Sequence, residues 1–336
     1  MKRKLAFLLM LCFGWSFFLN GCGGTLPKPD DRLQVVCTIF PEYDWARQLT
    51  QGVDNVDLTL LVKNGTDLHS YQPSVRDIAM IARADVFCYV GGVSDTWVND
   101  VLDTTENRTA QLVSMAEAAD ADEEVLAEGM QAEHEHEHEH EHEHDHHDDE
   151  SDSHEEPPEL DEHVWLSLRR AALACTAMKE ALCKADPAHE DIYNQNCTDY
   201  LQKLQELDSD FTEMTSQAAR DTIVVADRFP FRYLAEDYGL TYYAAFPGCS
   251  AETEASFETI VFLSEKVESL HLPCVLVTEG SNSSLAKTIL ENAGSDGKIL
   301  TLQSLQAVSQ KEIDTGVTYL SKMQENYDVL KQALNS

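Results

Sequence analysis

Short apolar runs alternate with amphipathic stretches through the first third of the chain. Runs rich in β-forming residues lie at 33–39, 56–62, 85–90 and 111–115, and stretches with helical spacing lie between them at 42–51, 74–82 and 95–102. Strand-sized apolar runs separated by helices are typical of a parallel sheet covered by helices. The pattern therefore predicts an N-terminal α/β lobe, which we place at 32–186.

A one-sided apolar seam follows this lobe. Its positions recur at alternating intervals of four and three residues, which is the spacing of one helix face. They are Tyr193, Cys197, Tyr200, Leu204, Leu207, Phe211 and Met214. A helix over 187–218 would be roughly 45 Å long, and Pro187 suits its first turn. Because the seam spans only about four heptads and has no copy elsewhere, we expect a single linking helix, 187–219, rather than a coiled coil.

The α/β alternation then resumes. Strands are expected at 222–226, 241–245, 274–278 and 298–302, and a last helix at 315–334. These elements predict a C-terminal α/β lobe at 220–336. The predicted fold is therefore α/β, with two parallel-sheet lobes joined by a long rigid helix. A cleft between two lobes is a common place for a ligand.

The N-terminus has the pattern of an export signal. Three basic residues precede an apolar run at 5–19, which is shorter than the roughly 20 residues of a membrane span. The run ends at Leu19-Asn20-Gly21-Cys22, which resembles the bacterial lipobox, whose cysteine is lipidated. We expect a signal peptide at 1–21, lipidation of Cys22, and a tether at 22–31. The alternative is an uncleaved N-terminal anchor, and both place the folded part outside the cytoplasm, at the membrane surface.

Charge and cysteine content narrow the classes of partner. The formal net charge of -36 excludes nucleic acid as a natural partner and favours cations. Seven cysteines remain after Cys22, and none forms a CxxC pair, so a zinc ribbon is excluded. Most lie in apolar runs, which favours buried free thiols. A disulfide stays open, although an odd number leaves one thiol over.

A segment rich in histidine and acidic residues interrupts the first lobe. Lysine and arginine are absent between Arg108 and Arg169, and we expect the part from 117 to 160 to be disordered without a ligand. Its histidines are His134, His136, His138, His140, His142, His144, His146, His147 and His154. Imidazole and carboxylate both bind zinc, so the segment is interpreted as an auxiliary metal-capture loop that holds several ions loosely. A solvated acidic linker is the alternative.

Two histidines outside the loop lie beside predicted strands or helices. His69 stands in GTDLHSYQPS after a predicted strand, and His163 stands in DEHVWLSL before a helix. Together with the opening TIFPEY, these segments resemble, in order and spacing, the zinc/manganese solute-binding lipoproteins of ABC importers. The similarity covers about 33–335. It implies that His69 and His163 are metal ligands, and the acidic histidine-rich loop is typical of the zinc branch.

The second lobe departs from the pattern of this family. Members carry a third histidine before a Tyr-Gly-Leu segment, whereas this chain has Arg228 or Asp227 there, depending on the direction of counting. A guanidinium stays protonated and cannot bind a metal, so Asp227 is the candidate, with an ion pair to a neighbouring arginine as its alternative. The family's acidic ligand is assigned to Glu279, with a loop or capping role as the alternative. Glu254 is held in reserve.

The resemblance implies an extracytoplasmic lipoprotein, not an enzyme, that captures Zn²⁺, or alternatively Mn²⁺, and delivers it to an ABC permease and its ATPase. We expect a lipid-anchored monomer at the outer face of the cytoplasmic membrane, with ligands from both lobes closing on one ion. The alternatives are a secreted metal-dependent hydrolase and a metal-buffering or adhesive surface lipoprotein. The hydrolase is disfavoured because no catalytic motif stands outside the histidine-rich segment.

Overall fold

The computed structural model describes residues 32–63, 65–105, 109–130, 160–250 and 254–336. The predicted signal peptide, the tether with Cys22, and the nine histidines of the predicted capture loop lie outside these ranges. Within the loop segment, residues 117–130 are described. They begin at the end of helix α5 (Met115–Ala118). Glu123 in this range forms an antiparallel bridge with Leu160, on the far side of the undescribed residues.

The first lobe is built on a parallel sheet with the strand order β2-β1-β3-β4. Its strands are β1 (Leu33–Cys37), β2 (Val56–Leu60), β3 (Val86–Tyr89) and β4 (Gln111–Ser114). The connecting helices and 3-10 turns are α2 (Phe40–Leu49), η1 (Leu68–Ser70), α3 (Val75–Ile81), η2 (Val93–Asp95) and α4 (Trp97–Thr104). The central strands β1 and β3 are apolar and largely buried on both faces, as expected for a parallel sheet covered by helices.

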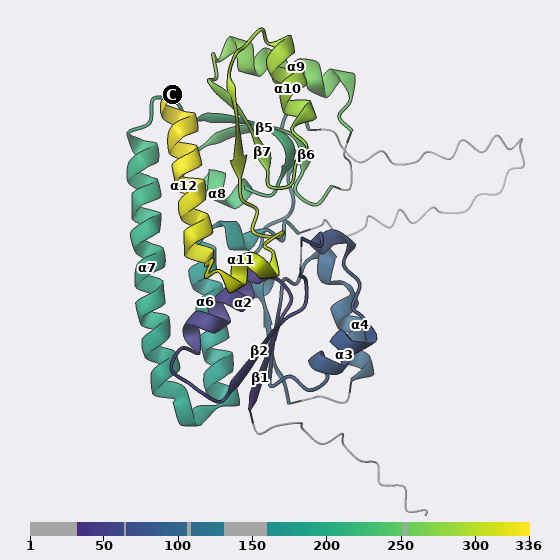
Figure 1. Ribbon diagram of the computed structural model, residues 1–336, viewed down its shortest axis with the longest axis vertical. Coiled ribbons are helices and arrows are strands. Elements are labelled where there is room, and N and C mark those ends of the chain that lie inside the picture. The colour runs from purple at the N-terminus through teal and green to yellow at the C-terminus, as the bar shows by residue number, and fades with distance from the viewer. Residues whose placement is uncertain (1–31, 64, 106–108, 131–159, 251–253) are drawn as a thin grey trace, which may run out of the picture. The chain divides into compact units, whose positions relative to one another are not determined.

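The second lobe repeats this plan with the strand order β6-β5-β7-β8. Its strands are β5 (Thr222–Phe229), β6 (Thr241–Pro247), β7 (Cys274–Thr278) and β8 (Lys298–Leu302). Its helices are α8 (Arg232–Asp237), α9 (Phe257–Ser269), α10 (Ser284–Asn292), α11 (Gln310–Asp314) and α12 (Tyr319–Asn335). The predicted α/β fold with two parallel-sheet lobes is confirmed (Figure 1).

Strand β5 is longer than its apolar run. The sequence predicts an end at residue 226, whereas the strand continues to Phe229 across an irregularity between Val225 and Arg228. The extension contains the polar pair Asp227 and Arg228, which breaks the apolar pattern. It pairs with the end of β6 and brings this polar pair to the carboxyl edge of the sheet.

The predicted long helix is α7 (Glu190–Ser216), preceded by the 3-10 turn η4 (Pro187–His189). All seven positions of the seam are buried. At 1.5 Å per residue, α7 is about 40 Å long. It packs against α2, α6 (Leu168–Ala185) and α12, and then leads directly into β5. In Figure 1, α12 returns alongside α7, so the C-terminal helix adds a second connection between the lobes.

Cysteine side chains contribute to packing in both lobes. All seven cysteines of the described residues carry free thiols, and five of them are buried. Cys183 and Cys249 are only half-buried. Among the described residues, we find no helix that combines the length and the apolar character needed to cross a bilayer.

Candidate metal centre

The carboxyl ends of parallel strands supply half of the candidate centre. His69 lies in η1, which follows β2, and Cys249 follows the end of β6 in the other lobe. His163 is the residue before the 3-10 turn η3 (Val164–Leu166), and Glu162 precedes it. Loops at the carboxyl ends of parallel strands are the usual ligand sites of α/β proteins. Side chains from distant parts of the sequence therefore meet between the two sheets.

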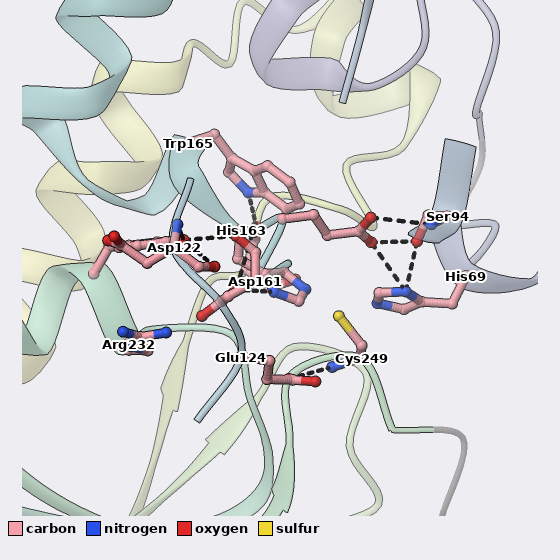
Figure 2. A network of polar contacts seen from close by, with 12 residues as sticks. His69, Ser94, Asp122, Glu124, Asp161, His163, Trp165, Arg232 and Cys249 are labelled. Carbon is pink, nitrogen blue, oxygen red and sulfur yellow. Dashed lines mark hydrogen bonds and ion pairs between the residues drawn. The ribbon is translucent and has the colours of Figure 1, made fainter. Parts of the chain in front are cut away.

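Four side chains converge at this place. Each of His69, Glu162, His163 and Cys249 offers one donor atom, and these atoms all lie within 4.8 Å of one another. The centroids of the two imidazole rings are 5.5 Å apart. Figure 2 shows the sulfur of Cys249 directed toward the space between the two rings. Two imidazoles, a carboxylate and a thiol are the donor groups that bind zinc in proteins.

Hydrogen bonds fix the orientation of His69. Its backbone N–H donates to Asp67 Oδ1 at 3.1 Å, which holds the turn. Its Nδ1 lies 2.7 Å from Ser94 Oγ and 3.2 Å from Glu162 Oε1. The other ring nitrogen, Nε2, is buried and has no hydrogen-bond partner among the described residues. A buried polar atom without a partner is costly, so Nε2 marks the side of the ring that is open to a ligand.

His163 is held in the same manner. Both its backbone N–H and its Nδ1 contact Asp161 Oδ1, at 3.1 and 2.9 Å. Its Nε2 is also buried without a partner among the described residues. The adjacent Trp165 donates through Nε1 to the carbonyl of Ser304 at 2.9 Å, which anchors this segment to the second lobe. A carboxylate on one ring nitrogen is the usual arrangement behind a metal-binding imidazole, because it selects the tautomer that exposes Nε2.

Glu162 is a fully buried carboxylate. Its Oε2 accepts the Ser94 N–H at 3.0 Å, and its Oε1 accepts the Ser94 hydroxyl. Burial alone would raise its pKa, but the hydrogen bond with His69 and the charges of both imidazoles outweigh burial and lower the pKa below its ordinary value. The carboxylate is therefore ionised at neutral pH.

The pKa values of His163 and Cys249 are raised, in contrast to the lowered pKa of Glu162. Burial would lower the pKa of His163, but the hydrogen bond and charge of Asp161 outweigh it and raise the pKa. Burial and the charges of Glu162, Glu124 and Asp161 raise the pKa of Cys249 far above its ordinary value. Without an ion, this thiol is therefore protonated at neutral pH.

Two glycines permit this close packing. A Cβ atom added at Gly92 would lie 2.2 Å from Glu162 Oε2, and one added at Gly248 would lie 2.8 Å from His163 Cε1. Both contacts are shorter than van der Waals distances. Only glycine therefore fits at these two positions while the donors keep their arrangement.

The structure places the predicted ligands of the second lobe outside this group. Asp227 Oδ2 accepts from Thr278 Oγ1 at 2.7 Å, and its Oδ1 accepts the Arg228 N–H at 2.9 Å. Glu279 accepts from the N–H and hydroxyl of Ser304 at 2.6 and 2.7 Å. Burial raises the pKa of Glu279, despite these bonds. Glu254 is exposed in a bend. The structure thus brings together His69 and His163 but adds Glu162 and Cys249 instead.

Arg228 is one of the two residues at the place where the family resemblance expects a third histidine. Its Nη1 lies 2.9 Å from Asp67 Oδ2, and this ion pair joins β5 of the second lobe to the turn that carries His69. Burial would raise the pKa of Asp67, but the Arg228 charge and hydrogen bond outweigh it and lower the pKa. Where a ligand is expected, this chain has a contact between the lobes.

A second pair of buried acids lies at the carboxyl ends of β1 and β3. Glu42 Oε2 accepts from the Thr38 N–H at 2.7 Å, and Asp95 Oδ2 accepts from the Val90 N–H at 2.6 Å. The second oxygen of each has no partner among the described residues. Burial, followed by the charge of Asp95, raises the pKa of Glu42 to about 8. Burial, together with the charge of Glu162, raises the pKa of Asp95 to about 7.

This pair makes the stability of the metal-free protein depend on pH. The folded-state pKa of Glu42, about 8, lies above its ordinary value. The folded state therefore binds the proton of Glu42 more tightly than the unfolded state does. The resulting stabilisation of the fold is complete below the unfolded-state pKa and is lost as pH rises through about 8. We expect the unfolding free energy to fall by on the order of 2–3 kcal/mol between pH 5.5 and 8 because of this group.

Urea unfolding in the presence of a chelator measures this loss. The control is Glu42→Gln, in which the fall over the same pH range should be smaller by a comparable amount. Equal pH profiles for the two proteins would show that Glu42 does not titrate in this range.

Comparison with known proteins defines the class of this chain. The fold, with two parallel-sheet lobes, is that of a two-lobed solute-binding protein. The family described as zinc-uptake complex component A, periplasmic, matches residues 35–333. The chain belongs to this family.

Individual relatives are similar over nearly the whole chain. The zinc-binding lipoprotein AdcA of Streptococcus pneumoniae is 31% identical over 332 residues, which cover 99% of this chain and 61% of that protein. The high-affinity zinc uptake system protein ZnuA of Bacillus subtilis is 30% identical, with 98% and 96% covered. The chain thus spans 61% of the length of the streptococcal relative.

Solved structures agree on the fold. The Zn(II)-bound ZnuA-like domain of Streptococcus pneumoniae AdcA is 28% identical, with a TM-score of 0.68 and coverage of 91% of this chain and 100% of that domain. The periplasmic zinc-binding protein TroA of Treponema pallidum has a TM-score of 0.70 at 22% identity, which shows the fold alone.

Proposed function

We propose that this chain captures Zn²⁺ with His69, Glu162, His163 and Cys249 and delivers it to an ABC importer. The observation that carries the proposal is the pair of buried Nε2 atoms without partners, which share one place with a carboxylate and a thiol. Tetrahedral zinc with bonds of about 2.0–2.3 Å needs donor atoms about 3.3–3.8 Å apart. The observed limit of 4.8 Å therefore requires a contraction of only about 1 Å.

Charge balance supports a divalent ion. Glu162 carries one negative charge, and Cys249 acquires a second when the ion replaces its proton. Two neutral imidazoles complete the set, so a bound dication gives a net charge of zero. An uncompensated charge would be costly in a buried site. The donor group is thus complementary to a divalent cation.

The thiolate favours zinc over manganese. Soft sulfur and imidazole donors suit Zn²⁺, whereas Mn²⁺ prefers carboxylates, carbonyls and water. From the sequence, two carboxylates of the second lobe were assigned as ligands, Asp227 and Glu279. Such oxygen donors would have favoured a harder ion such as Mn²⁺. A single carboxylate with a thiolate shifts the preference toward zinc. The relatives named as zinc-binding and zinc-uptake proteins support the same choice.

The donor number favours capture over catalysis. Catalytic zinc sites keep one coordination position open for water or substrate. Here four protein donors satisfy a tetrahedral ion, so no position remains for a reacting water. The family also supports transport, because it is described as a component of zinc uptake. We accordingly assign an ABC permease and its ATPase as partners, with a lipid anchor at Cys22.

Metal titration with elemental analysis tests the function. The intact protein should bind one zinc ion tightly and further ions loosely. Deletion of Glu133 to Glu156 removes the nine histidines of the predicted capture loop and should lower the total stoichiometry, while one tight site survives. Mn²⁺ should compete poorly for that site. Loss of the tight site on deletion, or equal affinity for Mn²⁺, would contradict the assignment to the buried group.

A further inference from the structure

A segment of the first lobe lies against the second lobe beside the metal centre. We call residues 122–130 the strap. Contacts with α8 and α9 of the second lobe join Asp122 to Tyr233, Glu123 to Arg232, and Glu128 to Lys266. On the side of the first lobe, Asp122 also pairs with Arg170, and Glu123 forms the bridge with Leu160. The strap is therefore held by both lobes.

Glu124 of the strap lies next to a proposed zinc ligand. Its Oε1 accepts the backbone N–H of Cys249 at 3.4 Å, and Figure 2 shows the two residues side by side. Glu124 nevertheless lies outside the group of four donors. A half-buried carboxylate thus borders the centre without belonging to it.

Exposure identifies the side from which an ion reaches the centre. Glu162 and His163 are fully buried, whereas His69 and Cys249 keep part of their surface exposed. An arriving ion therefore meets the side of Cys249 and His69 first. Glu124 is itself half-buried and contacts the backbone of Cys249, one of these two partly exposed residues. A partly exposed carboxylate beside a partly exposed donor residue is placed to meet an arriving ion before the buried donors do.

We propose that Glu124 is a transfer ligand that binds zinc on its way into and out of the centre. This inference rests on the proposed zinc function. The carboxylate replaces one water of the hydrated ion. The Zn–O bond to Glu124 then breaks as the Zn–S bond to Cys249 forms, and the thiol proton passes to solvent water. A permanent role is disfavoured, because a fifth donor would exceed tetrahedral coordination and leave the centre negatively charged.

A transfer ligand has a distinct kinetic signature. It stabilises an intermediate that is common to binding and release, so its loss slows both steps. The association and dissociation rate constants should fall together, and Kd should stay nearly constant. Loss of a permanent ligand would instead accelerate dissociation and weaken Kd. A merely structural role would likewise change Kd.

Stopped-flow kinetics on Glu124→Gln test this signature. The amide oxygen can still accept the Cys249 N–H, so the local fold is retained. The matched control is Glu128→Gln, which removes the same charge from the same strap next to Lys266. We expect both rate constants for Zn²⁺ to fall about tenfold in Glu124→Gln, with Kd within about threefold of wild type. Both rate constants of Glu128→Gln should stay within about twofold of wild type.

High salt separates coordination from long-range attraction. The Debye length falls to about 3 Å at 1 M salt, so distant charges no longer act on the ion. The difference between the two variants should persist there. Equal rates for the variants, a difference that vanishes in salt, or a weakened Kd with an unchanged association rate would each overturn the inference. Absence of tight zinc binding by the wild-type protein would instead overturn the proposed function itself.

Discussion

Replacing both His69 and His163 by alanine should abolish the tight zinc site. These residues supply the two imidazoles of the centre, and each is oriented by a carboxylate bound to its Nδ1. Four-donor zinc sites bind with apparent free energies of about 10–16 kcal/mol. Loss of two donors should weaken zinc binding by at least about 10³-fold. Competition with a chromophoric chelator measures this change.

A matched control uses the histidines of the described residues that lie outside the centre. These are His189, which pairs with Asp186, and His271, which has a positive φ of 49°. His189→Ala combined with His271→Asn removes two imidazoles, and asparagine tolerates the left-handed backbone at 271. This variant should keep wild-type affinity. Zinc should also raise the melting temperature of wild type and control, but not of the His69/His163 variant. If the His69/His163 variant bound zinc within tenfold of wild-type affinity, the assignment of these two histidines as ligands would be refuted.

Local pattern was sufficient to predict the lobes, whereas the assignment of His69 and His163 as ligands depended on the family resemblance. Apolar runs of strand length determine the sheets, because a parallel strand is buried on both faces and shows this directly in its composition. His69 follows such a run, whereas His163 directly precedes the 3-10 turn η3. The carboxyl ends of parallel strands share one edge. His69 is therefore expected at the edge of the sheet, whereas the expectation that His163 meets it there came from the family resemblance.

The remaining donors depend on side-chain directions that local pattern does not determine. Asp227 and Glu279 do lie at strand ends of the second lobe, but Thr278 and Ser304 hold their carboxylates. Cys249 was grouped with the packing cysteines. A signal was nevertheless present, since Cys249 follows Pro247 and Gly248 at the end of an apolar run rather than lying inside one. Glu162, directly before His163, was not singled out from the sequence.

The ion pair of Arg228 with Asp67 suggests how the second lobe compensates for its missing ligands. In the expected arrangement, a histidine and an acid of the second lobe would connect the lobes through the metal. Here the guanidinium connects them directly, while Cys249 is the candidate donor from this lobe. Part of the contact between lobes therefore exists without an ion. This is consistent with a small contraction on binding rather than a large closure.

Cys249→Ser should weaken zinc binding by about 10²-fold and narrow the preference for zinc over manganese, because a hydroxyl is a poor substitute for a soft thiolate. Cobalt(II) reports the change directly. A thiolate-to-cobalt charge-transfer band should appear in the near ultraviolet for wild type and be absent in the variant. Cys183→Ser is the control, since Cys183 is also a half-buried free thiol but lies in α6. An unchanged cobalt spectrum in Cys249→Ser would remove Cys249 from the donor set.

The pH dependence of the affinity provides a second criterion for Cys249. Burial and three neighbouring carboxylates keep the pKa of this thiol well above neutrality. Zinc must therefore displace its proton, and proton release makes the affinity rise with pH. Between pH 6.5 and 8, the logarithm of the wild-type association constant should rise with a slope about one unit steeper than that of Cys249→Ser. Equal slopes would mean that the ion binds without the thiolate, even if the serine variant binds more weakly.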